Sequence, residues 1–182
     1  NFTAMLNEAC PDLAASQPGQ LDSSAFPKLK WVVSLRGDTP PGMLSWDALL
    51  ARADETSPDE LSRIEAQVSP EQPVNIQYTS GTTGHPKGAT LSHSNILLNG
   101  YYAGTSQQIT HADRICLPVP LYHCFGCVLG SLCSLAHGAA AIYPGDHFDA
   151  GATLRAIEQE RCTAIYGVPT MFLAELEHPE FR

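Results

Sequence analysis

From Val74 onward, short apolar segments alternate with amphipathic ones, and this alternation limits the folds open to the chain. Four apolar segments predict strands, over 74–78, 114–118, 139–143 and 162–166. After them, helices are predicted over about 92–106, 125–137 and 150–160 and from Pro169. Regular β-α alternation indicates a mostly parallel sheet with helices on both faces. We therefore expect an α/β fold whose ligands bind at the carboxyl ends of its strands.

The first predicted strand runs into a loop of glycines and hydroxyl residues, Tyr78–Gly88, with the sequence YTSGTTGHPKG. Glycines let backbone amides approach an anion, hydroxyls add donors, and Lys87 adds a mobile positive charge. The loop is therefore predicted to bind phosphate. It is neither a Walker A loop nor a Rossmann loop, because Pro86 precedes Lys87 and the glycine spacing differs. A flexible polar surface loop is the alternative.

The residues after the loop, from Ala89, predict a turn, a cap at Ser92 and then a helix. Further along, Pro118–Gly126 lies between a predicted strand and an apolar helix, so His123 follows a strand end. A histidine packed in the core is the alternative, but a strand end in a parallel sheet favours a site.

Both segments resemble motifs of the adenylate-forming enzymes. This superfamily holds acyl-CoA synthetases, adenylation domains of peptide synthetases and firefly-type luciferases. YTSGTTGHPKG is similar to their phosphate-loop signature, and PLYHCFG is similar to their P-x-x-H-x-x-G motif. The resemblance implies that His123 borders the acyl group and that Lys87 neutralises charge on the leaving pyrophosphate. It implies that the β- and γ-phosphates of ATP are held by Thr79, Ser80, Gly81, Thr82, Thr83, Gly84, His85, Pro86 and Lys87.

The resemblance also implies a reaction. The parent enzyme would be an ATP-dependent acid–thiol ligase, most similar to acyl-CoA synthetases for medium- or long-chain fatty acids. It would use Mg²⁺ and ATP to make an acyl-adenylate and pass the acyl group to coenzyme A. Two alternatives stay open: an adenylation domain of another class, such as a peptide synthetase, and a non-catalytic nucleotide-binding or interaction module.

The organisation of the chain points to a part of a larger domain. Residues 1–73 predict a leading helix over 1–9, a strand over 29–35, a short helix from Trp46 and a polar connection over 54–73 with a helical turn at 61–64. Residues 74–182 carry the β-α repeats. The family's adenine-binding motif and its C-terminal lid domain with a catalytic lysine do not appear in this sequence. We therefore expect an internal fragment of the N-terminal AMP-binding domain, inactive by itself because many positioning groups are missing.

The amino-acid composition limits the kinds of molecule that the protein is expected to bind. A net charge of −9 and a pI near 5.1 argue against nucleic acid and anionic membrane surfaces. The uncharged run between Arg114 and Asp146 is long enough for a membrane span, but prolines and histidines interrupt it, so no span is expected. The partners expected are a carboxylic acid, ATP, coenzyme A and the rest of the protein's own chain. A cytoplasmic location is expected, with the mitochondrial matrix as the alternative for a eukaryotic parent.

The six cysteines are expected to be free thiols, five of them in apolar segments. Cys124 and Cys127 have CxxC spacing, but no second pair completes a zinc site, so no metal site is predicted from the side chains.

Overall fold

The computed structural model describes residues 2–79 and 84–181, and the chain divides into two compact units, Asn1–Gln67 and Val68–Arg182. The first unit holds short elements only. In order, these are α1 (Phe2–Ala9), η1 (Pro11–Ala15), β1 (Val33–Ser34), β2 (Leu44–Ser45), α2 (Trp46–Leu50), η2 (Ala53–Glu55) and α3 (Pro58–Glu65). Its core consists of Cys10, Leu13, Leu21 and Met43.

The helices of the first unit were largely predicted, and its strands only in part. The leading helix ends before Pro11, and α2 begins at Trp46 with Ser45 as its cap. The connection over 54–73 holds more helix than expected, because Ser57 caps a helix that begins at Pro58. The strand predicted over 29–35 is wrong in extent: only Val33–Ser34 is a strand, pairing in parallel with β2, which the sequence did not indicate.

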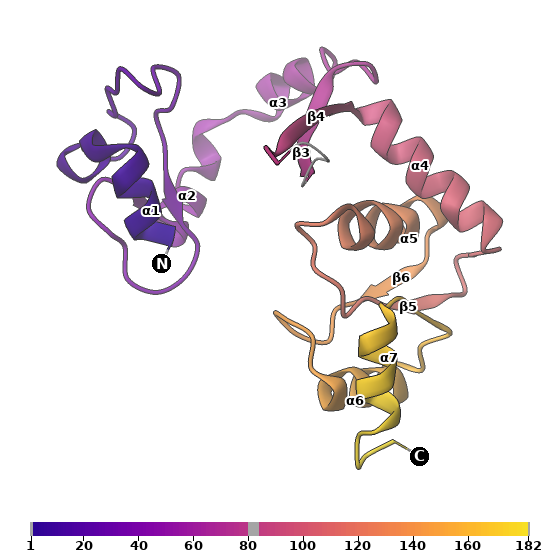
Figure 1. Ribbon diagram of the computed structural model, residues 1–182. Coiled ribbons are helices and arrows are strands. Elements are labelled where there is room, and N and C mark those ends of the chain that lie inside the picture. Colours follow the sequence, from indigo (N-terminus) through magenta and orange to yellow (C-terminus); the bar gives the residue numbers. More distant parts are fainter. Residues whose placement is uncertain (1, 80–83, 182) are drawn as a thin grey trace. The chain divides into compact units, whose positions relative to one another are not determined.

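The second unit opens with an antiparallel hairpin of β3 (Pro73–Thr79) and β4 (Lys87–Ser92), which Figure 1 shows in magenta. This corrects two predictions. The strand over 74–78 belongs to a two-stranded sheet and not to the parallel sheet. The residues after the loop form a second strand, and the helix α4 (His93–Ser106) starts only after it. The predicted cap at Ser92 is confirmed, since its hydroxyl accepts a hydrogen bond from the Asn95 amide in a capping box.

The parallel sheet lies further along the chain, with the strand order β6-β5-β7. Its strands are β5 (Arg114–Cys116), β6 (Ala140–Ile142) and β7 (Ala164–Ile165), all shorter than predicted. The central strand is the most buried, with Ile115 and Cys116 fully inaccessible. The expected α/β class with a parallel sheet is confirmed, although the repeat begins at β5 and not at Val74.

Helices cover both faces of this sheet. The chain passes from β5 to β6 in one direction and from β6 to β7 in the other, so right-handed connections put the intervening helices on opposite faces. Figure 1 shows α5 on one side of β5 and β6 and α6 and α7 on the other. These helices are α5 (Cys133–His137), α6 (Ala150–Glu160) and α7 (Pro169–Leu176). The caps predicted at Asp149 and Gly138 and the start at Pro169 are confirmed.

The helix predicted over 125–137 differs in its winding. Its first part, η3 (Phe125–Leu132), is a π-helix, and only the last residues form α5. The predicted apolar stripe is confirmed at Val128, which is buried, and is wrong at Leu135, which is 73% exposed. α4 packs against both parts at its two buried glycines: a Cβ on Gly100 would lie 3.1 Å from the Val128 carbonyl oxygen of η3, and a Cβ on Gly104 would lie 2.4 Å from the His137 ring of α5.

Among residues 2–79 and 84–181, no helix combines the length and the hydrophobicity that a membrane crossing requires.

Candidate functional site

The predicted phosphate loop connects the two strands of the hairpin. Thr79 and Lys87 face each other as the last pair of the ladder, so they form the base of the loop. Of the predicted phosphate-binding residues, Ser80, Gly81, Thr82 and Thr83 lie outside the described residues. Gly84, His85 and Pro86 complete the loop, and all three are exposed. Gly84 has a φ of +88°, a left-handed conformation that glycine adopts without strain.

Lys87 begins β4 and is exposed to solvent. Within the described part of the chain, no carboxylate forms an ion pair with its ammonium group. The charge is thus available to an external anion. A phosphate chain is bound by hydroxyl groups, by glycines in the left-handed conformation and by an unpaired ammonium group. The described residues of the loop provide all three, so they fit a triphosphate.

His123 lies in the connection between β5 and η3. Its Nδ1 accepts a hydrogen bond from the Phe125 amide at 3.0 Å, so this nitrogen carries no proton and the proton resides on Nε2. The Cys124 thiol lies 3.7 Å from the same nitrogen. The side chain is exposed, which rules out the alternative of a packed core histidine within this structure. His123 therefore offers a fixed ring whose free nitrogen is a hydrogen-bond donor.

One hydrogen bond connects the two motifs. The Gln77 side-chain amide on β3 donates to the Tyr122 carbonyl at 3.4 Å, across 45 residues of sequence. Gln77 lies two residues before Thr79, and Tyr122 directly precedes His123. The contact places the hairpin that carries the phosphate loop beside the segment that carries the histidine, as a shared site requires.

A pocket of about 430 Å³ opens at the carboxyl ends of the parallel strands. It is lined by Leu117–Tyr122 after β5, by Tyr143 and Gly145–Phe148 after β6, and by Met171. The connections that leave β5 and β7 turn to opposite faces, and in α/β sheets such a crossing point is where ligands bind. There Phe125 packs against Tyr166, with ring centroids 5.5 Å apart. The mostly apolar lining suits an acyl chain.

Gly126 explains why the second motif ends in glycine. It is buried, and a Cβ on it would lie 2.4 Å from the Pro120 carbonyl oxygen and 3.1 Å from that of Val119. Both neighbours are backbone atoms, so the turn that presents His123 would have to open to admit a side chain.

We expect Gly126→Ala to lower the free energy of unfolding by about 1–3 kcal/mol, the usual range for overpacking a close contact. Urea denaturation measures this change. Gly145→Ala is the matched control, because its Cβ would meet only the His147 carbonyl at an ordinary 3.6 Å. Equal effects of the two substitutions would contradict the packing argument.

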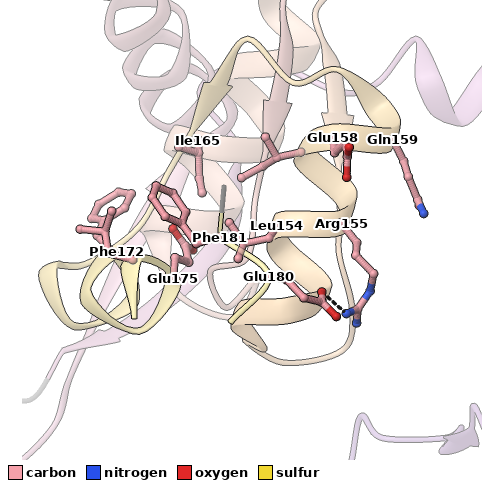
Figure 2. A pocket seen from close by; sticks show the side chains of 11 residues that line it. Leu154, Arg155, Glu158, Gln159, Ile165, Phe172, Glu175, Glu180 and Phe181 are labelled. Atoms are coloured by element: carbon pink, nitrogen blue, oxygen red, sulfur yellow. Dashed lines mark hydrogen bonds and ion pairs between the residues drawn. The ribbon is translucent and has the colours of Figure 1, made fainter. Parts of the chain in front are cut away.

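A larger pocket, of about 830 Å³, lies between α6, α7 and β7 and holds no residue of either motif. Figure 2 shows Ile165, Phe172 and Phe181 around it, with Arg155 paired to Glu180 at 2.8 Å on one side. Because its walls carry no residue of either motif, whereas the smaller pocket includes Pro120, Leu121 and Tyr122 of the second motif, we place the candidate site at the smaller pocket. No sequence pattern indicated this larger pocket.

Glu175 is the unusual residue of the larger pocket. It is 6% exposed, and its Oε1 has no hydrogen-bond partner among the described residues. Burial raises the pKa of this carboxyl, because the charged form loses solvation. No sequence pattern pointed to Glu175, because only its burial on α7 makes it unusual.

The raised pKa of Glu175 predicts a pH-dependent stability. The folded state holds the proton more tightly, so stability falls as pH rises from the unfolded pKa through the raised folded pKa. Glu175→Gln should remove this fall and raise the free energy of unfolding at pH 7 by about 1–3 kcal/mol relative to the wild-type chain. Urea denaturation at pH 4 and pH 7 tests it, with the exposed Glu177→Gln as control. If the free energy of unfolding of the wild-type chain and of Glu175→Gln changed with pH in the same way, Glu175 would not be the source of the pH dependence.

The remaining histidines and cysteines form no metal centre. In the described ranges no group of three or more His, Cys, Asp or Glu side chains could hold an ion. All six cysteines are free, as predicted. His137 and His178 hydrogen-bond to backbone groups, Tyr101 O at 2.9 Å and Glu180 N at 3.2 Å.

Comparison with known proteins identifies the family. The model of the family described as AMP-binding enzyme matches residues 5–182. The chain is 41% identical to the putative acyl-CoA synthetase YngI of Bacillus subtilis, over 100% of this chain and 33% of that protein. It is also 41% identical to the mitochondrial medium-chain acyl-CoA ligase ACSF2 of Danio rerio, over 99% of this chain and 30% of that protein. The chain thus spans about a third of the length of these relatives.

Solved structures agree with this result. The inhibitor-bound N-terminal domain of FACL13 from Mycobacterium tuberculosis aligns with a TM-score of 0.57 and 28% identity, over 80% of this chain and 36% of that one. ATP-bound MatB from Rhodopseudomonas palustris aligns with a TM-score of 0.55 and 28% identity, over 73% and 30%. With a family model that covers nearly its whole length, the chain belongs to the AMP-binding enzyme family.

Proposed function

We propose that the protein carrying this chain is an ATP-dependent acid–thiol ligase, and that this chain is part of its N-terminal AMP-binding domain. One observation carries the proposal: the Gln77–Tyr122 hydrogen bond joins the phosphate hairpin to the segment of His123. An ATP site and an acyl site must adjoin for a carboxylate to reach the α-phosphate. The relatives named acyl-CoA synthetase and acyl-CoA ligase support the same chemistry.

In the proposed reaction a substrate carboxylate attacks the α-phosphate of ATP, pyrophosphate leaves, and the thiol of coenzyme A then displaces AMP. Lys87 and the Thr79–Pro86 loop hold the β- and γ-phosphates, so positive charge already lies where negative charge accumulates on the leaving group. Mg²⁺ would bind together with ATP, coordinated by the phosphates, because the described side chains offer no carboxylate cluster that could hold the ion.

The proposed role of His123 is to position the acid. With Nδ1 occupied by the Phe125 amide, Nε2–H can donate to a carboxylate oxygen of the substrate. The apolar pocket beside it, with Leu117, Val119 and Phe148 in its lining, would take the start of the hydrocarbon chain. We propose a medium- or long-chain fatty acid as the substrate. The relative ACSF2 is named a medium-chain acyl-CoA ligase, which favours medium-chain acids.

The experiment is to incubate the full-length protein with ATP, Mg²⁺, coenzyme A and straight-chain acids of increasing length. Acyl-CoA is measured by mass spectrometry, and AMP and pyrophosphate are measured in parallel. We expect all three products in equal amounts, with a maximum at medium chain length. Acyl transfer only to a carrier protein would favour a peptide-synthetase class, and ATP binding without pyrophosphate would favour a non-catalytic module. A cytoplasmic location is proposed, and ACSF2 is described as mitochondrial.

A further inference from the structure

Glu175 is a buried acid that lines the larger pocket without a partner. Its side chain projects from α7 into the space that Leu154, Ile165 and Phe172 also line, and Figure 2 shows these four side chains together. Only 6% of Glu175 is exposed, and its Oε1 meets no hydrogen-bond donor among the described residues. A buried carboxylate without a donor is costly, so folded proteins normally pair it. The carboxyl therefore indicates that a further group belongs in this pocket.

The pocket carries more acid than base. Its charged lining residues are three glutamates and one arginine, namely Glu158, Glu175, Glu180 and Arg155. Arg155 already pairs with Glu180 at 2.8 Å, and both of these side chains are half exposed. Within the described ranges, no ion pair involves Glu158 or Glu175. A group that complements this pocket should therefore carry positive charge and should reach the carboxyl of Glu175.

Apolar side chains and a strand edge lie around the same pocket. Leu176 and Phe181 line it, yet about half of each side chain is exposed. Ile165 lines it from β7, and among the described strands β7 has a neighbour, β5, on one side only. A free strand edge offers backbone donors and acceptors to another strand, and exposed apolar surface favours a cover. Both features favour a protein segment over a small cation as the source of the positive charge.

We infer that Glu175 is the acidic half of a buried ion pair, and that its basic half is a lysine or arginine from a segment of the full-length protein outside residues 1–182. That segment covers α7 beside the edge of β7, and its cation donates to Oε1 of Glu175. The relatives are about three times as long as this chain, so a full-length protein of their size contains enough chain for such a segment. A long basic side chain suits this pocket, because its aliphatic stem can pack on Leu154 and Phe172 while its charged end reaches the acid.

In the full-length protein, Glu175→Gln should lower the midpoint of thermal unfolding at pH 7 by about 5 °C or more, and Glu175→Leu by at least as much. Removal of one partner from a buried ion pair leaves the other charge buried and uncompensated, which is strongly destabilising. This sign is opposite to the gain predicted for Glu175→Gln in residues 1–182, where the acid has no partner. An unchanged or higher midpoint in the two full-length variants would overturn the proposal.

Two further substitutions are the controls for this measurement. Glu177→Gln removes an exposed acid that directly follows α7, and it should change the midpoint by no more than about 1 °C. Arg182→Gln removes the basic residue that follows Phe181 in the sequence, and it should have an equally small effect. A loss in Arg182→Gln as large as that in Glu175→Gln would assign the basic partner to this chain and would contradict the inference.

Accessibility of α7 tests the cover separately from the ion pair. Leu176→Cys is labelled with a maleimide in the full-length protein, folded and unfolded in urea, and the labelled peptides are identified by mass spectrometry. We expect labelling at position 176 to be at least about tenfold slower in the folded protein, because the covering segment must open first. A small cation or a separate protein would be absent from the purified sample, so equal rates in the two states would overturn the proposal. Protection that disappears on dilution would assign the cover to a second copy and would overturn it as well.

A photoreactive side chain at the same position identifies the segment. With p-benzoylphenylalanine in place of Leu176, irradiation of the full-length protein should link α7 to a peptide outside residues 1–182 that contains a lysine or arginine. The absence of any link, or links only within residues 1–182, would contradict the inference. None of these measurements uses ligase activity, so the ion pair and the proposed ligase function can fail separately.

Discussion

Replacing Lys87 with alanine in the full-length protein should lower the rate of pyrophosphate release by about 10²–10³-fold, with little change in stability. This range is what removal of one preorganised charge-stabilising group costs in other active sites. The physical reason lies in the hairpin: Lys87 is the first residue of β4, opposite Thr79, and its ammonium group meets no carboxylate of the described chain. Among residues 2–79 and 84–181, no ion pair of the fold depends on that charge.

Lys28→Ala is the matched control, because Lys28 is an exposed lysine of the first unit, remote in sequence from both motifs. Pre-steady-state release of pyrophosphate and thermal unfolding are measured on both variants. Unchanged release in Lys87→Ala, or equal losses in the two variants, would remove Lys87 from the site.

The second large effect is expected at His123. His123→Asn keeps a short acceptor for the Phe125 amide but removes the Nε2–H donor, so the turn should persist while the acid loses a hydrogen bond. A hydrogen bond to a charged group is worth about 1.5–3 kcal/mol. At that value we expect kcat/KM for the acid to fall about 10–150-fold, with KM for ATP nearly unchanged.

His123→Gln separates the two parts of this argument, since its longer amide can reach outward as a donor. It should retain more activity than the asparagine variant. Steady-state kinetics with the acid and with ATP varied in turn decide the matter. Wild-type kcat/KM in His123→Asn would mean that the ring only shapes the turn.

The sequence was informative where the chemistry is local. Ser92, Asp149 and Gly138 act as helix caps as their residue types predict, because a cap needs only the side chain and the next turn of backbone. The two motifs were found for a similar reason: each is a continuous run of residues.

The sequence failed where structure depends on distant partners. Lys87–Ser92 contains glycine, alanine and lysine, which favour strands weakly, and it becomes a strand only because β3 lies beside it. The assignment of Val74–Tyr78 to the parallel sheet failed for the same reason. Nothing in FGCVLGSL distinguishes a π-helix from an α-helix, and Glu175 became notable only when its burial was known.

The most direct test of the central claim, that the hairpin and the His123 segment form one acid-activating site, is isotope exchange between labelled pyrophosphate and ATP in the full-length protein. The account predicts exchange that requires a fatty acid, does not require coenzyme A, and is nearly lost in Lys87→Ala. Exchange that is absent with every fatty acid tried, while the protein still binds ATP, would contradict it.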